Sequence, residues 1–331
     1  MLHRSLLFLL LPLSLSLTAP AQTKPATTKP ATAKLAVTVK SAAAKPATTK
    51  PAAAKPTTSK ATTTKAAAKK TTATKPATKA PTEAQVLEQA SELMLERKYE
   101  SAFKLLNKFD PKHRRPAVAL KQTELALNYH LRSRELEGFG FRDLAPLERL
   151  DSLRLKYTRA AIPYSFAVEP ILLNLKKRYP TNYKLDRALA DYYYQVLQCE
   201  CAEAEKSPKA LMALITRYYT NAHKHGLGDY LSYYAFGYVR MSQGRFAESV
   251  PLFKRSIELR PNYPLAHFNL AYSYNELKKL PEARDEIHAA AKLFAEENSP
   301  LKEDAEFMAE DIDRRLAAIV PEKPKPASTK K

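Results

Sequence analysis

The 331-residue sequence contains little of what β-rich and membrane-spanning proteins need. It has six glycines, and no run of alternating polar and apolar residues lies along it, so amphipathic strands are not expected. Its one long apolar run, Leu6 to Leu17, has about twelve residues, fewer than the ~20 of a membrane-spanning helix. The absence of these features predicts a helical protein with no membrane-spanning domain.

Sequence patterns that support catalysis are also missing. The chain has no G-x-S-x-G, no H-E-x-x-H and no G-x-x-x-x-G-K-[ST] motif. Gly138 and Gly140 fall in an expected loop, and because no strand is predicted before them they do not form a phosphate-binding turn. Carboxylates such as Glu296 and Glu303 are interspersed with lysines, as on a solvated helix face. We therefore predict a protein that is not an enzyme and has no catalytic residues, no cofactor and no metal.

The only two cysteines, Cys199 and Cys201, and the pair His223 and His225 could suggest a metal site. A helix predicted over residues 208–222 separates the two pairs by ~22 Å, which is too far for a shared ion. In an oxidising compartment the cysteines could be free, joined in a strained disulfide, or linked to another chain. The sequence leaves their role open.

The N-terminus resembles a secretory signal over residues 1–21. His3 and Arg4 precede the apolar run, and Ala19-Pro20-Ala21 fits a small-x-small cleavage site. We expect cleavage there and a periplasmic or secreted protein. The alternative is an uncleaved segment that tethers the chain to a membrane.

Residues 22–81 consist almost entirely of lysine, alanine, threonine and proline, and residues 321–331 repeat that composition. Neither segment can bury enough apolar surface to offset the entropy of ordering, so both are predicted to be disordered. The basic arm, residues 22–81, could act as a spacer, as a tether for an anionic envelope polymer, a membrane surface or nucleic acid, or as both. It has no aromatic residue with which to stack bases, so sequence-specific nucleic-acid binding is not expected.

The net charge of +20 belongs mostly to these tails. Residues 1–82 hold Arg4 and thirteen lysines against no acid, and residues 321–331 hold four lysines against one glutamate. The remaining middle of the chain carries only +3. Any attraction to polyanions is therefore expected from the tails rather than from the folded part, residues 82–320.

Apolar residues follow helical spacing almost continuously from Glu83 to Val320, which predicts about twelve helices. A helix pair is expected over residues 83–109, followed by a long helix at 116–136. A loop at 137–146 and two further helices at 146–160 and 165–178 complete the first half.

Two adjacent stretches, residues 230–263 and 264–297, carry one pattern at an offset of 34 residues. Small residues coincide at three positions, and large apolar residues coincide between them. The small pairs are Gly237 with Ala271, Ser249 with Ala283, and Ser256 with Ala290. This period is typical of solenoids built from helix pairs. A last helix, about 300–319, is predicted to cap the stack with Leu301, Phe307, Ile312, Leu316 and Ile319 on one side.

These positions, with Leu259-Arg260-Pro261-Asn262 at the junction, resemble the tetratricopeptide repeat (TPR). The resemblance implies an all-α solenoid in which the first helices of successive repeats line a concave groove. It is weakest over residues 112–162, where Lys156 stands at a position expected to be small. The implied partner-binding groove residues are Leu231, Tyr234, Tyr238, Met241, Leu265, Phe268, Tyr272 and Asn275.

Family members that clasp a C-terminal carboxylate use lysine and asparagine where this chain has Tyr234 and Tyr238, so that ligand is disfavoured. Thirteen of the 18 tyrosines lie between Tyr183 and Tyr274, and they could serve repeat packing or a binding surface. We expect an exported scaffold or adaptor that binds a protein or peptide partner through an aromatic groove. The alternative is an envelope- or polyanion-tethering protein that acts through its basic arm.

Overall fold

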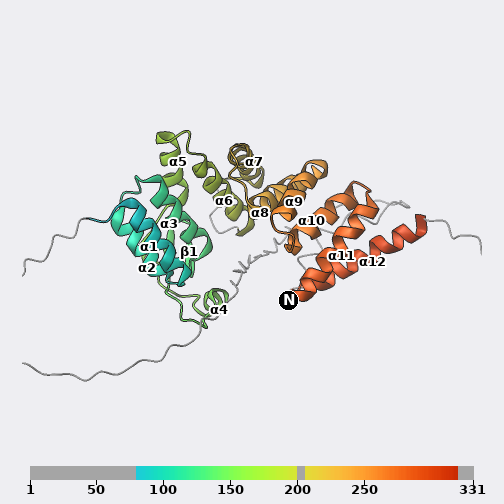
Figure 1. The fold of residues 1–331 in the computed structure, drawn as a ribbon, viewed down its shortest axis with the longest axis horizontal. Helices are drawn as coiled ribbons and strands as arrows, with labels where there is room; N and C mark the ends of the chain where they lie inside the picture. The colour runs from blue at the N-terminus through green and yellow to red at the C-terminus, as the bar shows by residue number, and fades with distance from the viewer. Residues whose placement is uncertain (1–79, 200–205, 320–331) are drawn as a thin grey trace, which may run out of the picture.

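The computed structural model describes residues 80–199 and 206–319, where the chain forms helices that follow one another along a curved stack (Figure 1). The helices are α1 (Glu83–Leu95), α2 (Tyr99–Phe109), α3 (Pro116–Asn128), α4 (Leu150–Lys156), α5 (Val168–Arg178), α6 (Tyr183–Cys199), α7 (Pro208–Lys224), α8 (Tyr230–Ser242), α9 (Phe246–Leu259), α10 (Pro264–Glu276), α11 (Leu280–Glu296) and α12 (Lys302–Ile319). Three short strands, β1 (Arg132–Arg134), β2 (Gly138–Gly140) and β3 (Tyr164–Ser165), accompany them. This confirms the predicted helical solenoid. The predicted signal segment, most of the basic arm, the basic tail and Cys201 lie outside the described residues.

Two hydrophobic clusters run through the stack and meet in α8. The first cluster extends from α1 to Phe236 and Val239 of α8. The second begins with Tyr234 and Met241 of the same helix and extends to α12. Each helix pair is therefore stabilised mainly by its neighbours, as in other repeat arrays. In the described ranges no helix is long and apolar enough to cross a membrane.

The two clear repeats are the helix pairs α8–α9 and α10–α11, and all six small residues of the repeat pattern are buried in them. The ring of Phe253 on α9 lies directly against Gly237 on α8. Ser249 and Ser273 share a 2.8 Å hydrogen bond between their hydroxyls, and Ser256 Oγ donates to the Tyr230 carbonyl at 2.7 Å. The small side chains thus let the paired helices approach closely.

Residues 129–165 differ from the prediction of two helices joined by a loop. The helix predicted to reach residue 136 ends at Asn128, and the one predicted over 146–160 is only α4, Leu150–Lys156. The expected loop instead contains β2, which pairs antiparallel with β1 on one side and with β3 on the other. The predicted loop and its two flanking helix boundaries were therefore wrong.

The sheet has no sequence signal because its strands are short and its turn is unusual. All three residues of β2 are buried, so polar and apolar residues do not alternate. The turn after β1 has positive φ at Glu135 (52°) and Leu136 (55°), where hairpins usually have glycine or asparagine. Gly140 is required because a Cβ at that position would overlap the Ala161 carbonyl.

The capping helix α12 packs through three of the five predicted positions: Ile312 is buried, and Leu301 and Leu316 pack against the second cluster. Ala305, Met308, Ala309 and Ile312, at helical spacing, are buried against the stack. Phe307 and Ile319, which were predicted to lie on the packed side, are 63% and 66% exposed. α12 packs mainly against α11.

Gly237 gives a test of close helix packing. Glycine to alanine normally favours a helix by ~1 kcal/mol, but a Cβ at position 237 would lie 2.8 Å from Phe253 Cε1, whose ring is fully buried. We expect Gly237→Ala to lower the free energy of unfolding by ~1–3 kcal/mol, measured by urea denaturation. Ser242→Ala, at the exposed end of the same helix, is the control, and stabilisation by Gly237→Ala would contradict the packing.

Candidate binding surface

The predicted groove residues lie along the first helices of the two repeats, α8 and α10, and the structure divides them into two groups. Five of them are half-buried, namely Leu231, Tyr238, Leu265, Phe268 and Tyr272. The other three are buried, with exposed fractions of 8% for Tyr234, 4% for Met241 and 5% for Asn275. A partner that approaches this face would therefore meet the first group.

The three buried residues hold neighbouring helices together. The Tyr234 hydroxyl accepts a 3.1 Å hydrogen bond from Asn269 Nδ2 on α10, and its ring makes an edge contact with Tyr263 at 5.1 Å. Burial raises the pKa of Tyr234. Asn275 Oδ1 accepts a 2.7 Å hydrogen bond from Arg315 Nη1 of α12. Their polar groups are thus occupied within the fold.

The half-buried aromatic residues are supported from behind by other rings. Phe268 makes an edge contact with Phe294 of α11, and Tyr272 makes one with Phe246 of α9, both with ring centroids 6.1 Å apart. Tyr238 contacts Tyr194 of α6 edge-on at 6.2 Å. Edge contacts of this kind restrict ring motion and add to stability. Each of these rings is therefore held by a neighbouring ring of the fold.

Tyr194 extends this surface to α6 and was not among the predicted groove residues. It is the last of three consecutive tyrosines, Tyr192 to Tyr194. Tyr192 and Tyr193 are buried in the first cluster, with Tyr193 stacked on Tyr218 at 5.9 Å. The helical turn of 100° per residue directs the third ring toward α8, and that spacing is the signal that could have identified it.

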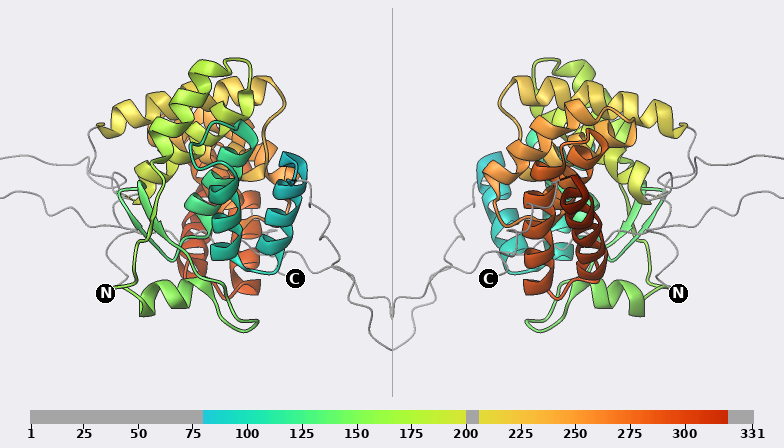
Figure 2. Two further views of the ribbon diagram at one scale, coloured as in Figure 1. Left: turned by 90° about the vertical axis from the view of Figure 1, so that its left-hand side faces the viewer. Right: turned by 90° about the vertical axis from the view of Figure 1, so that its right-hand side faces the viewer.

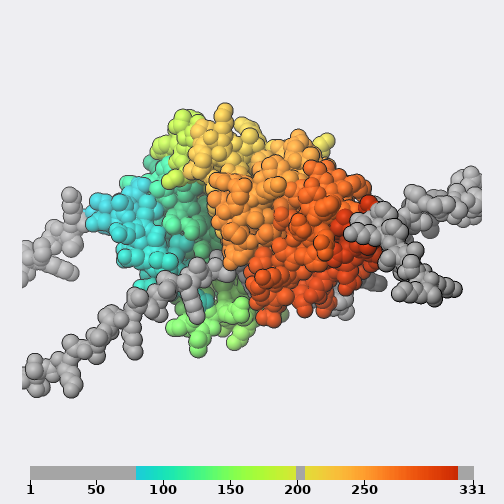
Figure 3. Space-filling model, turned by 45° about the vertical axis from the view of Figure 1, so that its right-hand side comes forward, coloured from blue at the N-terminus to red at the C-terminus, as the bar shows by residue number. Residues whose placement is uncertain are grey.

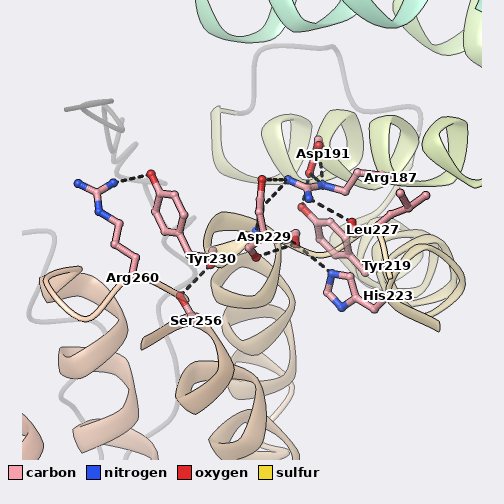
Figure 4. Close-up of polar contacts among 10 residues, drawn as sticks. Arg187, Asp191, Tyr219, His223, Leu227, Asp229, Tyr230, Ser256 and Arg260 are labelled. Carbon is pink, nitrogen blue, oxygen red and sulfur yellow. Dashed lines mark hydrogen bonds and ion pairs between the residues drawn. The ribbon is translucent and has the colours of Figure 1, made fainter. Parts of the chain in front are cut away.

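A polar network fixes the position of α6 relative to α8 (Figure 4). Arg187 on α6 binds Asp191 through Nε at 2.9 Å and Asp229 through Nη2 at 3.0 Å. Burial alone would lower the pKa of Arg187, but the two carboxylates outweigh it and raise that pKa.

The same carboxylates bind two further groups. Tyr219 of α7 donates to Asp191 at 2.7 Å. Asp229 is also the N-cap of α8 and accepts from the Ser232 amide. The network therefore joins three helices at the junction beside Tyr194.

A second polar contact orders the junction between the two repeats. Arg260, which follows α9, donates from Nη1 to the Tyr230 hydroxyl at 2.5 Å, and its guanidinium carbon lies 4.7 Å from the Tyr230 ring centroid. The Tyr230 carbonyl accepts from Ser256, as described above. Figure 4 shows that these groups lie on the α9 side of Tyr230, away from Arg187.

The two histidines of the H-x-H pair bond to different partners. His223 Nε2 lies 3.0 Å from Ser232 Oγ, and burial, with a smaller contribution from Arg187, lowers the pKa of His223 to about 4. His225 is exposed, stacks on Tyr183 and donates from Nδ1 to the Asn221 carbonyl at 2.8 Å. Among the side chains that the structure describes, no group of three histidine, cysteine or acidic residues is arranged to hold a metal ion.

Comparison with known proteins finds one family. Residues 237–278 match the family model described as TPR repeat. No curated protein sequence matches the chain significantly.

Several solved structures are similar in fold. MamA AMB-1 is 17% identical, with 63% of this chain and 96% of that chain covered at a TM-score of 0.40. The TPR protein TTC0263 of Thermus thermophilus is 16% identical over 72% of this chain and 98% of that one, with a TM-score of 0.39. The TPR2AB domain of yeast Sti1, solved as a complex with pHSP90, is 16% identical. The match covers 70% of this chain and 85% of that chain, with a TM-score of 0.31. These values are too low to transfer a ligand to this chain.

His223 makes the stability of the α7–α8 junction dependent on pH. Its folded pKa of about 4 lies below the ordinary 6.5, so the unfolded chain binds the proton first as pH falls from 6.5 toward 4. The folded state, in which His223 is neutral, therefore has its full stability above pH ~6.5. Between pH 6.5 and 4 the free energy of unfolding falls by up to ~3 kcal/mol. His223→Gln should reduce this loss in denaturation curves at several pH values. His225→Gln should keep the full loss, and an unchanged pH dependence in His223→Gln would contradict the prediction.

Proposed function

We propose that this chain, which is a tetratricopeptide-repeat protein, is an exported scaffold that binds an extended segment of a protein partner. The observation that carries the proposal is the row of half-buried apolar side chains on α8 and α10, with Tyr238, Phe268 and Tyr272 supported from behind by other rings. Rigid aromatic side chains lose little entropy on binding and dominate the affinity of many interfaces.

The chemistry of the row favours an apolar partner segment. The half-buried groove positions along α8 and α10 are leucine, tyrosine and phenylalanine. The side-chain oxygen of Asn275 already accepts a hydrogen bond from Arg315. The lysine and asparagine that would clasp a terminal carboxylate are replaced by aromatic residues. A partner segment with large apolar side chains would bury them against these rings, and main-chain groups of the partner could accept hydrogen bonds from the tyrosine hydroxyls.

Export is proposed from the N-terminal sequence alone. The short basic start, the apolar run from Leu6 to Leu17 and the small residues before Gln22 are typical of a cleaved signal. We place the protein in the periplasm or outside the cell. In this setting the basic arm would separate the scaffold from its point of attachment or hold it near anionic envelope material.

The groove is tested by substituting half-buried rather than buried tyrosines. Tyr238→Ala with Tyr272→Ala should weaken binding of the partner at least tenfold, because truncation of an aromatic hot spot typically costs ~2 kcal/mol or more. The partner is first captured from envelope extract, and its dissociation constant is then measured by calorimetry. Tyr179→Ala, an exposed tyrosine after α5, is the control.

The capture also separates the scaffold from the arm. Chains of residues 22–331 and 82–331 are compared at two salt concentrations. A partner that both chains retain at high salt supports the groove. Capture that needs residues 22–81 and is lost in high salt would overturn the proposal in favour of tethering by the arm, because such contacts are screened by salt.

A further inference from the structure

The most exposed large apolar side chains of the described residues belong to the end of α1 and to the segment around α4. Leu147 is 95% exposed, Leu95 85% and Leu155 82%. Leu95 ends α1, Leu147 lies three residues before α4, and Leu155 is in the last turn of α4. Figures 1 and 2 show α4 at the lower edge of the stack, and the space-filling view shows its green segment protruding at that edge (Figure 3).

The segment that carries Leu147 is attached to the end of α1. Arg97 donates from Nη1 to the Pro146 carbonyl at 3.0 Å and from Nη2 to the Glu148 carbonyl, on either side of Leu147. The Leu144 amide donates to the Arg97 carbonyl at 3.0 Å. These bonds tie the backbone on either side of Leu147 to Arg97, two residues after the last residue of α1.

The inner face of α4 is also anchored. Leu153 is buried, and Arg154 donates to the carbonyls of His130 at 2.9 Å and Asn128 at 3.1 Å. Arg142 pairs with Glu148 at 2.9 Å and lies over the Tyr157 ring. Ordering the backbone costs ~1–2 kcal/mol per residue, yet the leucines of this segment stay in water. The α4 corner, defined as Leu95 and residues 142–159, therefore presents apolar side chains in a fixed arrangement.

The outer side of the α4 corner is positively charged. Arg149, Lys156 and Arg159 are exposed, and within the described ranges none of them forms an ion pair. The nearby carboxylates are engaged in contacts: Asp143 accepts from the amide and hydroxyl of Ser101 on α2, and Glu96, next to Leu95, pairs with Lys98. Glu148 binds Arg142 and the Ala145 amide, and Asp151 binds Arg154. Cations around exposed leucines are typical of surfaces that bind an anionic membrane interface.

We propose that the α4 corner docks on an anionic phospholipid bilayer, with Leu95, Leu147 and Leu155 in the acyl boundary and the cations against the lipid phosphates. The charge pattern favours a bilayer over a second copy of this chain, because a two-fold contact would oppose like charges. The thirteen lysines of residues 1–82, with no acid among them, would attract the same surface. The docking holds the scaffold to the membrane and leaves α8 and α10 available to a partner.

The test uses the absence of tryptophan from the chain. Leu147→Trp in the full chain introduces one local fluorescent probe, and Leu259→Trp, at the end of α9, is the matched control. Both are mixed with vesicles of equal phosphatidylcholine and phosphatidylglycerol, with and without brominated acyl chains. Emission from position 147 should shift to shorter wavelength and be quenched by the brominated lipid, while emission from position 259 should change in neither way.

The readout is local, so attachment through the basic arm or the N-terminal apolar run does not change it. Arg149→Gln and Lys156→Gln in the Leu147→Trp background should each require about fivefold more anionic lipid for the same shift. Sedimentation with vesicles that leaves the emission from position 147 unchanged would overturn the proposal and assign binding to the arm or the N-terminal run. A shift that appears only on addition of envelope protein would also overturn it, in favour of a protein partner.

Discussion

The contacts of one half-buried guanidinium, that of Arg187, join α6 to α8 beside the binding surface. Arg187 reaches Asp191 on its own helix and Asp229 at the N-cap of α8, so the direction of α8 relative to α6 is fixed at a single point. The planar group has five donors in a rigid arrangement, so it constrains the direction of the contact. It adds little net stability, because the Asp229 side chain is 53% exposed to solvent. The contact of Tyr194 with Tyr238, and with it the continuity of the aromatic face across α6 and α8, follows from this alignment.

The aromatic face and the α4 corner represent two different uses of apolar surface. On α8 and α10 each half-buried ring makes a contact with a second ring, from α9, from α11 or from Tyr194 of α6, which is itself part of the surface. In the α4 corner the backbone and the arginines are held by polar contacts, and Leu147 and Leu155 have almost no neighbours. The first arrangement suits a segment that packs among rings. The second suits a soft interface that needs only apolar side chains and charge.

The repeats could be predicted because their signal is local and repeated. Gly237, Ser249 and Ser256 recur as alanines 34 residues later, and each is buried where the resemblance places it. The helix ends between residues 129 and 165 could not be predicted, because β2 is wholly buried and the β1–β2 turn has positive φ at ordinary side chains. On α12 the prediction failed for Phe307 and Ile319, because helix spacing from Ala305 and Ile312 directs the large apolar ring of Phe307 away from the packed face.

By itself, the sequence determined the helical period, the helix pairs of the two clear repeats, and the separation of a strongly basic arm from a nearly neutral folded part. These properties depend on composition and on the recurring spacing of residue types along the chain, so they can be predicted from the sequence alone. Only the tertiary structure decided which groove residues are enclosed, that Tyr194 joins the surface, and that the α4 corner presents leucines to solvent. Those outcomes depend on contacts between residues far apart in the chain, such as Arg187 with Asp229, Tyr194 with Tyr238, and Arg97 with Pro146, which exist only once the helices have packed.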